Sequence, residues 1–215
     1  MAESSNSDFH VKVGYKGLPA DRCEDHTVAV SGDFIMNAER FRSVLCISFV
    51  LAIICTNLEA AELIINNAPV KVLFNPGGRC TEVIIEEINN AKTEILVQAY
   101  SFTARPIAKA LVEAHKRGVD VHVIIDERKG KTQGSQATFL VNQKIPTYID
   151  GEQPRAHNKV IIIDGKTVIT GSFDFTTQAE ISAENLLIIK CSKLAKLYME
   201  NWMAHGEDSP VLAPE

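Results

Sequence analysis

One stretch of the sequence combines the residue types that could attack a phosphate. It begins at His157 and Lys159, ends at Ser172, and reads HNKVIIIDGKTVITGS. A neutral imidazole is a nucleophile or a general base near neutral pH, and a lysine two residues further supplies a positive charge and three hydrogen-bond donors. Gly171 and Ser172 add close backbone approach and a hydroxyl. The combination indicates attack on phosphorus, with the developing charge stabilised by protein groups.

The same stretch is expected to form a β-hairpin that positions these side chains. Residues 160–163 and 168–170 are β-branched runs, and Asp164-Gly165 between them is a turn signal. Because side chains alternate between the faces of a strand, His157 and Lys159 are expected to point the same way and to work as a pair. Asp164 has the opposite parity and lies at the turn, so a structural role is favoured over direct catalysis.

The spacing H-x-K-x4-D-x6-G-S resembles the signature of the phospholipase D superfamily. Residues 171–176, Gly-Ser-Phe-Asp-Phe-Thr, resemble its usual continuation, Gly-Ser-x-Asn. The resemblance extends to blocks at 70–78, 99–104, 116–121 and 126–128. Together these blocks are similar to the small bacterial Nuc-type endonucleases, which carry one copy of the motif.

The alternation of strand and helix patterns predicts a layered α/β fold. The resemblance implies that it is a mixed sheet flanked by helices, in one phospholipase D-like domain with one motif copy. Strands are expected at 70–74, 94–100, 119–126, 147–150, 160–163, 168–170 and 185–190. Helices are expected at 81–90 with Thr81 as N-cap, at 106–116, at 134–142 and at 192–204. The apolar side of the last helix is expected to consist of Leu194, Leu197, Tyr198 and Trp202.

The family chemistry that the resemblance implies needs two histidines, one to attack phosphorus and one to protonate the leaving oxygen. His10-Val-Lys12 begins like a second motif, but Gly17 stands where Asp is required and no Gly-Ser follows. For three of the other histidines, His115, His122 and His205, structural or solvated roles are favoured. The single motif therefore implies a homodimer, with two copies of His157 meeting across a two-fold axis.

The resemblance also implies roles for the remaining motif residues. Lys159 and Ser172 of both subunits would hold the phosphate oxygens, and Glu184 matches the family acid that orients the histidine. The alternative for Glu184 is an ordinary exposed carboxylate. No metal or other cofactor is expected, because the lysines neutralise the charge, and no CxxC, HxxxH or Cys/His cluster suggests zinc.

Asp174 departs from the family pattern, which has Asn at this position. Asn donates a hydrogen bond to a phosphate oxygen, whereas an ionised Asp cannot donate and repels it. Two like charges 4 Å apart cost up to about 4 kcal/mol at an effective dielectric of 20. Asp174 is therefore expected to turn away, to stay protonated or to slow the enzyme.

The Nuc-type resemblance favours nucleic acid as the substrate, DNA and possibly RNA, cut without sequence preference. The formal net charge of −5 gives no sign of a generally nucleic-acid-coating protein, so any phosphate attraction must be local. Candidate backbone contacts are Arg105, Arg128, Lys129 and Lys131, unless their region is only a solvated loop. The alternatives are a phospholipase D acting on lipid headgroups, which is less favoured, and a catalytically weak phosphate-binding protein.

The N-terminal part of the chain predicts export. Residues 36–60 have a basic start, an uncharged apolar run at 44–55 and small residues at the end, as in a secretory signal peptide. Met36 is then the start, residues 1–35 are an extension outside the mature protein, and residues 61–215 are the catalytic domain. This predicts a periplasmic or secreted protein; the alternative is a membrane anchor at 44–55.

Export would determine which cysteines remain in the protein and whether they can form a disulfide. Cys23, Cys46 and Cys55 lie in the segments expected to be removed, which leaves Cys80 and Cys191. An exported protein could pair them, and two buried free thiols are the alternative.

Overall fold

A computed structural model of the chain describes residues 61–207 and 209–214. The expected extension at 1–35, the signal peptide at 36–60, the second-motif candidate at His10 and three of the cysteines lie outside this part. The strands are β1 (Val70–Asn75), β2 (Glu94–Ala99), β3 (Asp120–Asp126), β4 (Thr147–Asp150), β5 (Lys159–Ile163), β6 (Thr167–Gly171) and β7 (Glu184–Lys190). The helices are α2 (Cys80–Asn90), α3 (Arg105–Lys116), α4 (Glu127–Gly130), α5 (Ala137–Asn142), the 3-10 helix η1 (Gln178–Ile181) and α6 (Ser192–Glu207).

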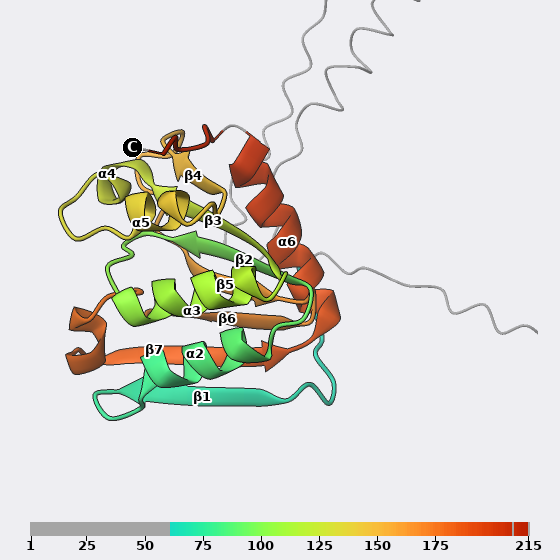
Figure 1. The fold of residues 1–215 in the computed structure, drawn as a ribbon. Coiled ribbons are helices and arrows are strands. Elements are labelled where there is room, and N and C mark those ends of the chain that lie inside the picture. Colours follow the sequence, from blue (N-terminus) through green and yellow to red (C-terminus); the bar gives the residue numbers. More distant parts are fainter. Residues whose placement is uncertain (1–60, 208, 215) are drawn as a thin grey trace, which may run out of the picture. The chain divides into compact units, whose positions relative to one another are not determined.

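The seven strands form one mixed sheet in the order β1-β7-β6-β5-β2-β3-β4 (Figure 1). β2, β3 and β4 run parallel, while β5, β6, β7 and β1 continue the sheet through antiparallel pairs. Helices α2 and α3 pack beside each other on one face, and α6 packs on the other. The predicted fold class, a layered mixed sheet flanked by helices, is confirmed.

Strand β5 shows why the sheet needs helices on both faces. All five of its residues are buried. Ile161 and Ile163 belong to the core between the sheet and the α2–α3 layer, whereas Val160 and Ile162 belong to the core under α6. An uninterrupted β-branched run is the pattern of a strand covered on both sides. The hairpin that carries the motif is therefore the centre of the domain.

Helix α6 covers only part of its face of the sheet. It packs against β2, β4, β5 and β6, and the indole N–H of Trp202 donates to the carbonyl oxygen of Val97 at 2.9 Å. The expected apolar side was wrong at Leu197, because the helix turns Ala195 and Met199 toward the sheet instead. The side chains that pack there are Leu194, Ala195, Tyr198, Met199 and Trp202.

The ends of the helices differ from the expectations. Thr81 is not the N-cap of α2, because the helix begins at Cys80 and its N-cap is Arg79, which has a left-handed backbone and no capping side chain. The carboxylate of Glu180, distant in sequence, accepts the Thr81 N–H at 2.7 Å instead. Helix α5 begins at Ala137 rather than at residue 134, and the short α4 and η1 were not expected. Within the described residues, no helix is both long and apolar enough to span a bilayer.

Cys80 and Cys191 are both free thiols, so the expected alternative of a disulfide is wrong. Cys80 follows the end of β1 and Cys191 follows the end of β7, and these strands are antiparallel, so the two cysteines lie at opposite ends of the strand pair. Cys80 is buried, with its thiol 3.2 Å from the Asn75 side-chain oxygen. Burial, followed by the nearby Glu180 and Glu184 carboxylates, raises the pKa of this thiol to about 11.

Candidate active site

The site is built at the start of β5, where the chain enters the central hairpin. His157 lies in the segment just before the strand and is exposed to solvent, whereas Lys159 is the first residue of the strand and is 7% exposed. The expectation that both belong to one strand is therefore wrong for His157. The expectation that they form a pair agrees with the structure.

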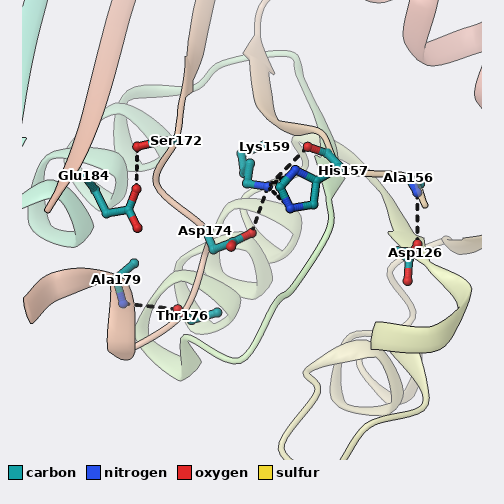
Figure 2. Close-up of polar contacts among 9 residues, drawn as sticks. All are labelled: Asp126, Ala156, His157, Lys159, Ser172, Asp174, Thr176, Ala179 and Glu184. Carbon is teal, nitrogen blue, oxygen red and sulfur yellow. Dashed lines mark hydrogen bonds and ion pairs between the residues drawn. The ribbon is translucent and has the colours of Figure 1, made fainter. Parts of the chain in front are cut away.

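The Lys159 ammonium lies against the His157 ring (Figure 2). Its Nζ is 2.9 Å from Nδ1, 3.1 Å from Nε2 and 3.2 Å from the His157 carbonyl oxygen. The ring of Tyr100 contacts the imidazole in a tilted arrangement, with ring centroids 4.3 Å apart and 54° between the ring planes. An accessible imidazole beside a buried cation can attack an anionic phosphate, because the cation compensates the negative charge of the ligand.

A buried carboxylate holds the segment that carries His157. Asp126, at the end of β3 and 3% exposed, accepts the Ala156 N–H at 3.0 Å through one oxygen (Figure 2). Its other oxygen accepts the Lys129 N–H at 3.1 Å. The Tyr100 N–H donates to the Asn158 carbonyl oxygen at 2.8 Å on the other side. Sequence reasoning missed this role for Asp126, although its position at the end of a predicted strand was a usable signal.

Asp174 turns toward the site rather than away from it. Its Oδ1 lies 3.4 Å from Lys159 Nζ, and its side chain is 30% exposed. Within the described residues Oδ1 is buried and accepts no hydrogen bond, so the ion pair with Lys159 is its polar contact. The first of the three sequence expectations for Asp174, that it turns away, is therefore wrong.

Ser172 and Glu184 form a second polar group beside the pair. The Ser172 hydroxyl donates to a Glu184 carboxylate oxygen (Figure 2). It also accepts the Asn185 N–H at 3.0 Å. Gly171 permits this approach, because a Cβ there would lie 2.3 Å from the Asn185 carbonyl oxygen. Within one chain the Glu184 carboxylate is thus bound to Ser172, and its expected contact with the histidine is not made.

Asp164 fixes the hairpin to the start of β2. Its Oδ1 accepts the N–H groups of Thr93 at 2.8 Å and of Glu94 at 3.2 Å, and both of its oxygens lie 3.1 Å from the Lys92 nitrogen. Partial burial acts to raise the pKa of this carboxyl, but these backbone donors outweigh it and hold the pKa below its ordinary value. The geometry agrees with the structural role expected for Asp164.

The structure brings one of the four candidate phosphate-binding cations to the histidine. Lys129 Nζ lies 5.2 Å from the centre of the Tyr100 ring, which itself contacts the His157 ring. Arg105 instead stacks on Phe139 with 3.7 Å between its guanidinium carbon and the ring centre. Lys131 pairs with Glu127 at 2.7 Å, and Arg128 lines a surface hollow among acidic side chains.

Two of the remaining histidines are bound by carboxylates, one on the same strand and one on a different element. His122 lies 3.0 Å from Asp120, and His205 lies 2.7 Å from the buried Asp150. These contacts agree with the structural roles that the sequence favoured. In residues 61–207 and 209–214, no group of three or more His, Cys, Asp or Glu side chains is arranged to hold a metal ion.

Comparison with known proteins places this geometry in a family. The family model described as cardiolipin synthase, PLD-like domain, matches residues 84–205. The chain belongs to the phospholipase D superfamily. It is 40% identical over 146 residues to a phospholipase D of Rickettsia prowazekii, which is 67% of this chain and 71% of that protein.

More distant and structural relatives agree with this assignment. The chain is 32% identical over 113 residues to a mouse mitochondrial cardiolipin hydrolase, which is 52% of this chain and 51% of that protein. The crystal structure of Nuc from Salmonella typhimurium, a phospholipase D family member, superposes with a TM-score of 0.66 at 40% identity. The match covers 68% of this chain and 99% of that chain. The predicted resemblance is confirmed, and the chain is a phosphodiester hydrolase of this superfamily.

Proposed function

We propose that this phosphodiester hydrolase is an endonuclease that cuts nucleic acid without a metal ion, through a phosphohistidine intermediate. The observation that carries the proposal is the exposed His157 ring held against the buried Lys159 ammonium. The likeness to Nuc over 99% of that chain supports nucleic acid as the substrate. Lys129 beside Tyr100 adds a cation that can bind a neighbouring backbone phosphate.

The reaction proceeds in two displacements. An imidazole nitrogen of His157 attacks phosphorus, the bond from phosphorus to one ester oxygen breaks, and a second histidine protonates that departing oxygen. The same second histidine then removes a proton from water, and the hydroxide displaces His157 from phosphorus. The products are an alcohol and a phosphomonoester, and both histidines return to their starting states. Lys159 and Ser172 hold the phosphate oxygens during both steps.

The second histidine comes from a second copy of the chain, in a homodimer. Each chain carries one motif, and Glu184 is bound to Ser172 rather than to its own His157. A partner chain placed across a two-fold axis would supply the missing histidine and could bring its Glu184 to His157. The contact between Glu184 and a histidine, which the family resemblance implies, is thus a contact between subunits.

The surface for that partner is the part of the sheet that α6 leaves open. Val70, Val72 and Phe74 lie on one face of the edge strand β1 and are 51%, 50% and 68% exposed. Phe74 pairs with Asn185, which contacts Ser172, so this apolar surface reaches the motif end of the sheet. Exposed apolar surface beside a site that lacks one histidine supports packing of a second copy there.

A lipid substrate is the second candidate. The relatives named phospholipase D and mitochondrial cardiolipin hydrolase favour it, and a phosphodiester in a headgroup presents the same reacting atoms as one in a nucleic acid. A third possibility is a catalytically weak phosphate-binding protein, which the contact between Asp174 and Lys159 favours.

One experiment separates these candidates. The full-length chain is incubated with excess EDTA and, in parallel, with plasmid DNA, RNA and phosphatidylcholine vesicles. His157→Ala is the test variant, and His122→Gln, which changes a histidine bound by Asp120, is the control. Cleavage of nucleic acid that only His157→Ala abolishes is the expected result. Release of choline without cleavage of nucleic acid would instead identify a phospholipase, and no reaction on any substrate would favour the phosphate-binding protein.

A further inference from the structure

The ion pair between Asp174 and Lys159 places a negative charge inside the phosphate site. We propose that Asp174 is a specificity-determining residue that removes the advantage a dianionic phosphate would have at a cationic site, so that phosphodiesters bind at least as tightly as phosphomonoesters. The proposal rests on the phosphodiesterase function described above. It concerns the charge of the bound phosphate and is the same whether the diester belongs to nucleic acid or to lipid.

The position of Asp174 is set by the core and not by the surface. Its neighbours Phe173 and Phe175 are 0% and 1% exposed, and the Phe175 carbonyl oxygen accepts the N–H groups of Thr103 and Ala104 at 3.0 and 2.9 Å. Two residues on, the Thr176 hydroxyl accepts the Ala179 N–H at 3.2 Å (Figure 2). The carboxylate is thus held at the site by buried side chains on both sides.

The positive charge of Lys159 is already balanced by the Asp174 carboxylate before a ligand binds. The ammonium is 7% exposed and faces the His157 ring nitrogens, the His157 carbonyl oxygen and Asp174 Oδ1. The Lys159–Asp174 pair therefore carries no net charge. Lys159 and the Oδ1 atom of Asp174 are buried, so water screens their contact less than it would at the surface, although the Asp174 side chain as a whole is 30% exposed.

The affinity of a phosphate ligand for this neutral pair depends on the charge of the ligand. A phosphodiester carries one negative charge, whereas a phosphomonoester carries about −1.5 to −2 at pH 7. Each added negative charge is attracted by Lys159 and repelled by Asp174 to a similar degree, so the second charge of a monoester brings no gain in affinity. Hydrolysis of a diester yields a monoester, so the same balance keeps the product from binding more tightly than the substrate.

The other charged and titratable groups around the pair do not cancel this effect. His157 and Lys129 lie around Tyr100 on one side, and Glu184, bound to Ser172, lies on the other (Figure 2). Glu184 adds a further negative charge, and all of these groups are unchanged when Asp174 alone is replaced. Asp174→Asn would leave Lys159 with an uncompensated positive charge and would add an amide donor, and both changes favour a dianion.

A matched pair of ligands tests the proposal without reference to catalysis. Methyl phosphate and dimethyl phosphate differ by one methyl group and, at pH 8, by about one charge. Their binding to the full-length chain is measured from 31P line widths during titration with protein. The native chain is expected to bind dimethyl phosphate at least as tightly as methyl phosphate. In Asp174→Asn, methyl phosphate is expected to bind about tenfold more tightly and dimethyl phosphate only about threefold more tightly.

The control variant is Asp120→Asn, which removes the same charge at the start of β3, where the side chain is 67% exposed and contacts only His122 among the described ion pairs. It is expected to leave both affinities unchanged. Equal tightening of both ligands in Asp174→Asn, or no tightening, would overturn the proposal. If that variant does not fold, the native chain still decides, because tighter binding of methyl phosphate than of dimethyl phosphate contradicts the proposal. If no nucleic acid is cleaved in the presence of EDTA, the proposed endonuclease function is refuted. The ratio of the affinities for methyl phosphate and dimethyl phosphate can still be measured in that case, so the two failures are distinguishable.

Discussion

The carboxylate of Asp126 accepts the backbone N–H of Ala156 at 3.0 Å, one residue before His157. Asp126 belongs to the end of β3, whereas His157 precedes β5, so this bond ties together segments about thirty positions apart in the chain. The same carboxylate caps α4 through the Lys129 N–H. A single buried side chain therefore positions both the histidine segment and the short helix that carries Lys129.

Asp126→Ala is expected to lower both stability and activity. The substitution leaves the N–H groups of Ala156 and Lys129 without their acceptor, and each unsatisfied buried donor costs about 1–3 kcal/mol. The free energy of unfolding from urea titration measures the first effect. For the second, kcat is measured at a temperature where the variant is folded, and it should fall because the imidazole loses its fixed position. Unchanged kcat in the folded variant would show that the bond to Ala156 does not position His157.

Lys159→Met is expected to reduce kcat by about 10²–10³, the usual cost of removing one group that stabilises the charge of the transition state. The side chain is buried, so Met conserves its bulk while removing the charge. Lys166→Met is the matched control, because Lys166 lies exposed in the turn of the same hairpin. A Lys159→Met enzyme that retains native kcat would show that the ammonium does not act on the phosphate.

The motif and the hairpin were predictable because their signals are local. The β-branched runs and the Asp164-Gly165 turn lie within a dozen residues, and β4 was predicted at its observed bounds, Thr147–Asp150. Both faces of β5 are buried, which an uninterrupted run of Val and Ile already indicates. The polar residues that interrupt this pattern were therefore the ones singled out as candidate site residues, and the structure brings His157 and Lys159 into contact.

The missed features depend on partners that are distant in sequence. Glu180 binds the start of α2 across 99 positions, so the local presence of Thr81 suggested the wrong cap. Asp126 binds Ala156 across 30 positions. The orientation of Asp174 toward Lys159 is set by the packing of Phe173 and Phe175 in the core, which a local pattern cannot show.

Asp164→Asn tests the anchoring of the hairpin through the pH dependence of stability. The pKa of Asp164 is lowered in the folded protein from 3.8, so its ionised form stabilises the fold above that pH, and the stabilisation is lost as the pH falls through the folded-state pKa. Asn also tolerates the positive φ of 54° at this position. The variant should be less stable at pH 7 by about 1–2 kcal/mol, because an amide is a weaker acceptor than a carboxylate.

The difference between the two proteins should therefore shrink below pH 4. Urea titrations of both proteins at pH 7, 5, 4 and 3 measure it. A constant difference over this range would mean that the charge of Asp164 is not what stabilises the hairpin. Asp120→Asn serves as the comparison, because Asp120 accepts none of the backbone bonds that Asp164 accepts.

Phe74→Glu is expected to split the proposed dimer. Phe74 is 68% exposed in the single chain and lies beside the open apolar face of β1, so a charge there would have to be buried against the partner. Sedimentation velocity at micromolar concentration measures the change from dimer to monomer. Activity should fall together with the dimer fraction, because a monomer would hold one catalytic histidine and the two displacement steps need two.

Val211→Glu is the matched control for this prediction. Val211 is 62% exposed and bridges to Tyr148 on β4, at the opposite edge of the sheet from β1. It is expected to leave both the dimer and the activity unchanged. A fully active Phe74→Glu monomer would exclude the two-subunit site, whereas an unchanged dimer would place the interface on another surface. Mixing His157→Ala chains with native chains adds a quantitative check. A native chain that exchanges into a mixed dimer loses the histidine of its partner. Activity should therefore fall below that of the same amount of native chains alone.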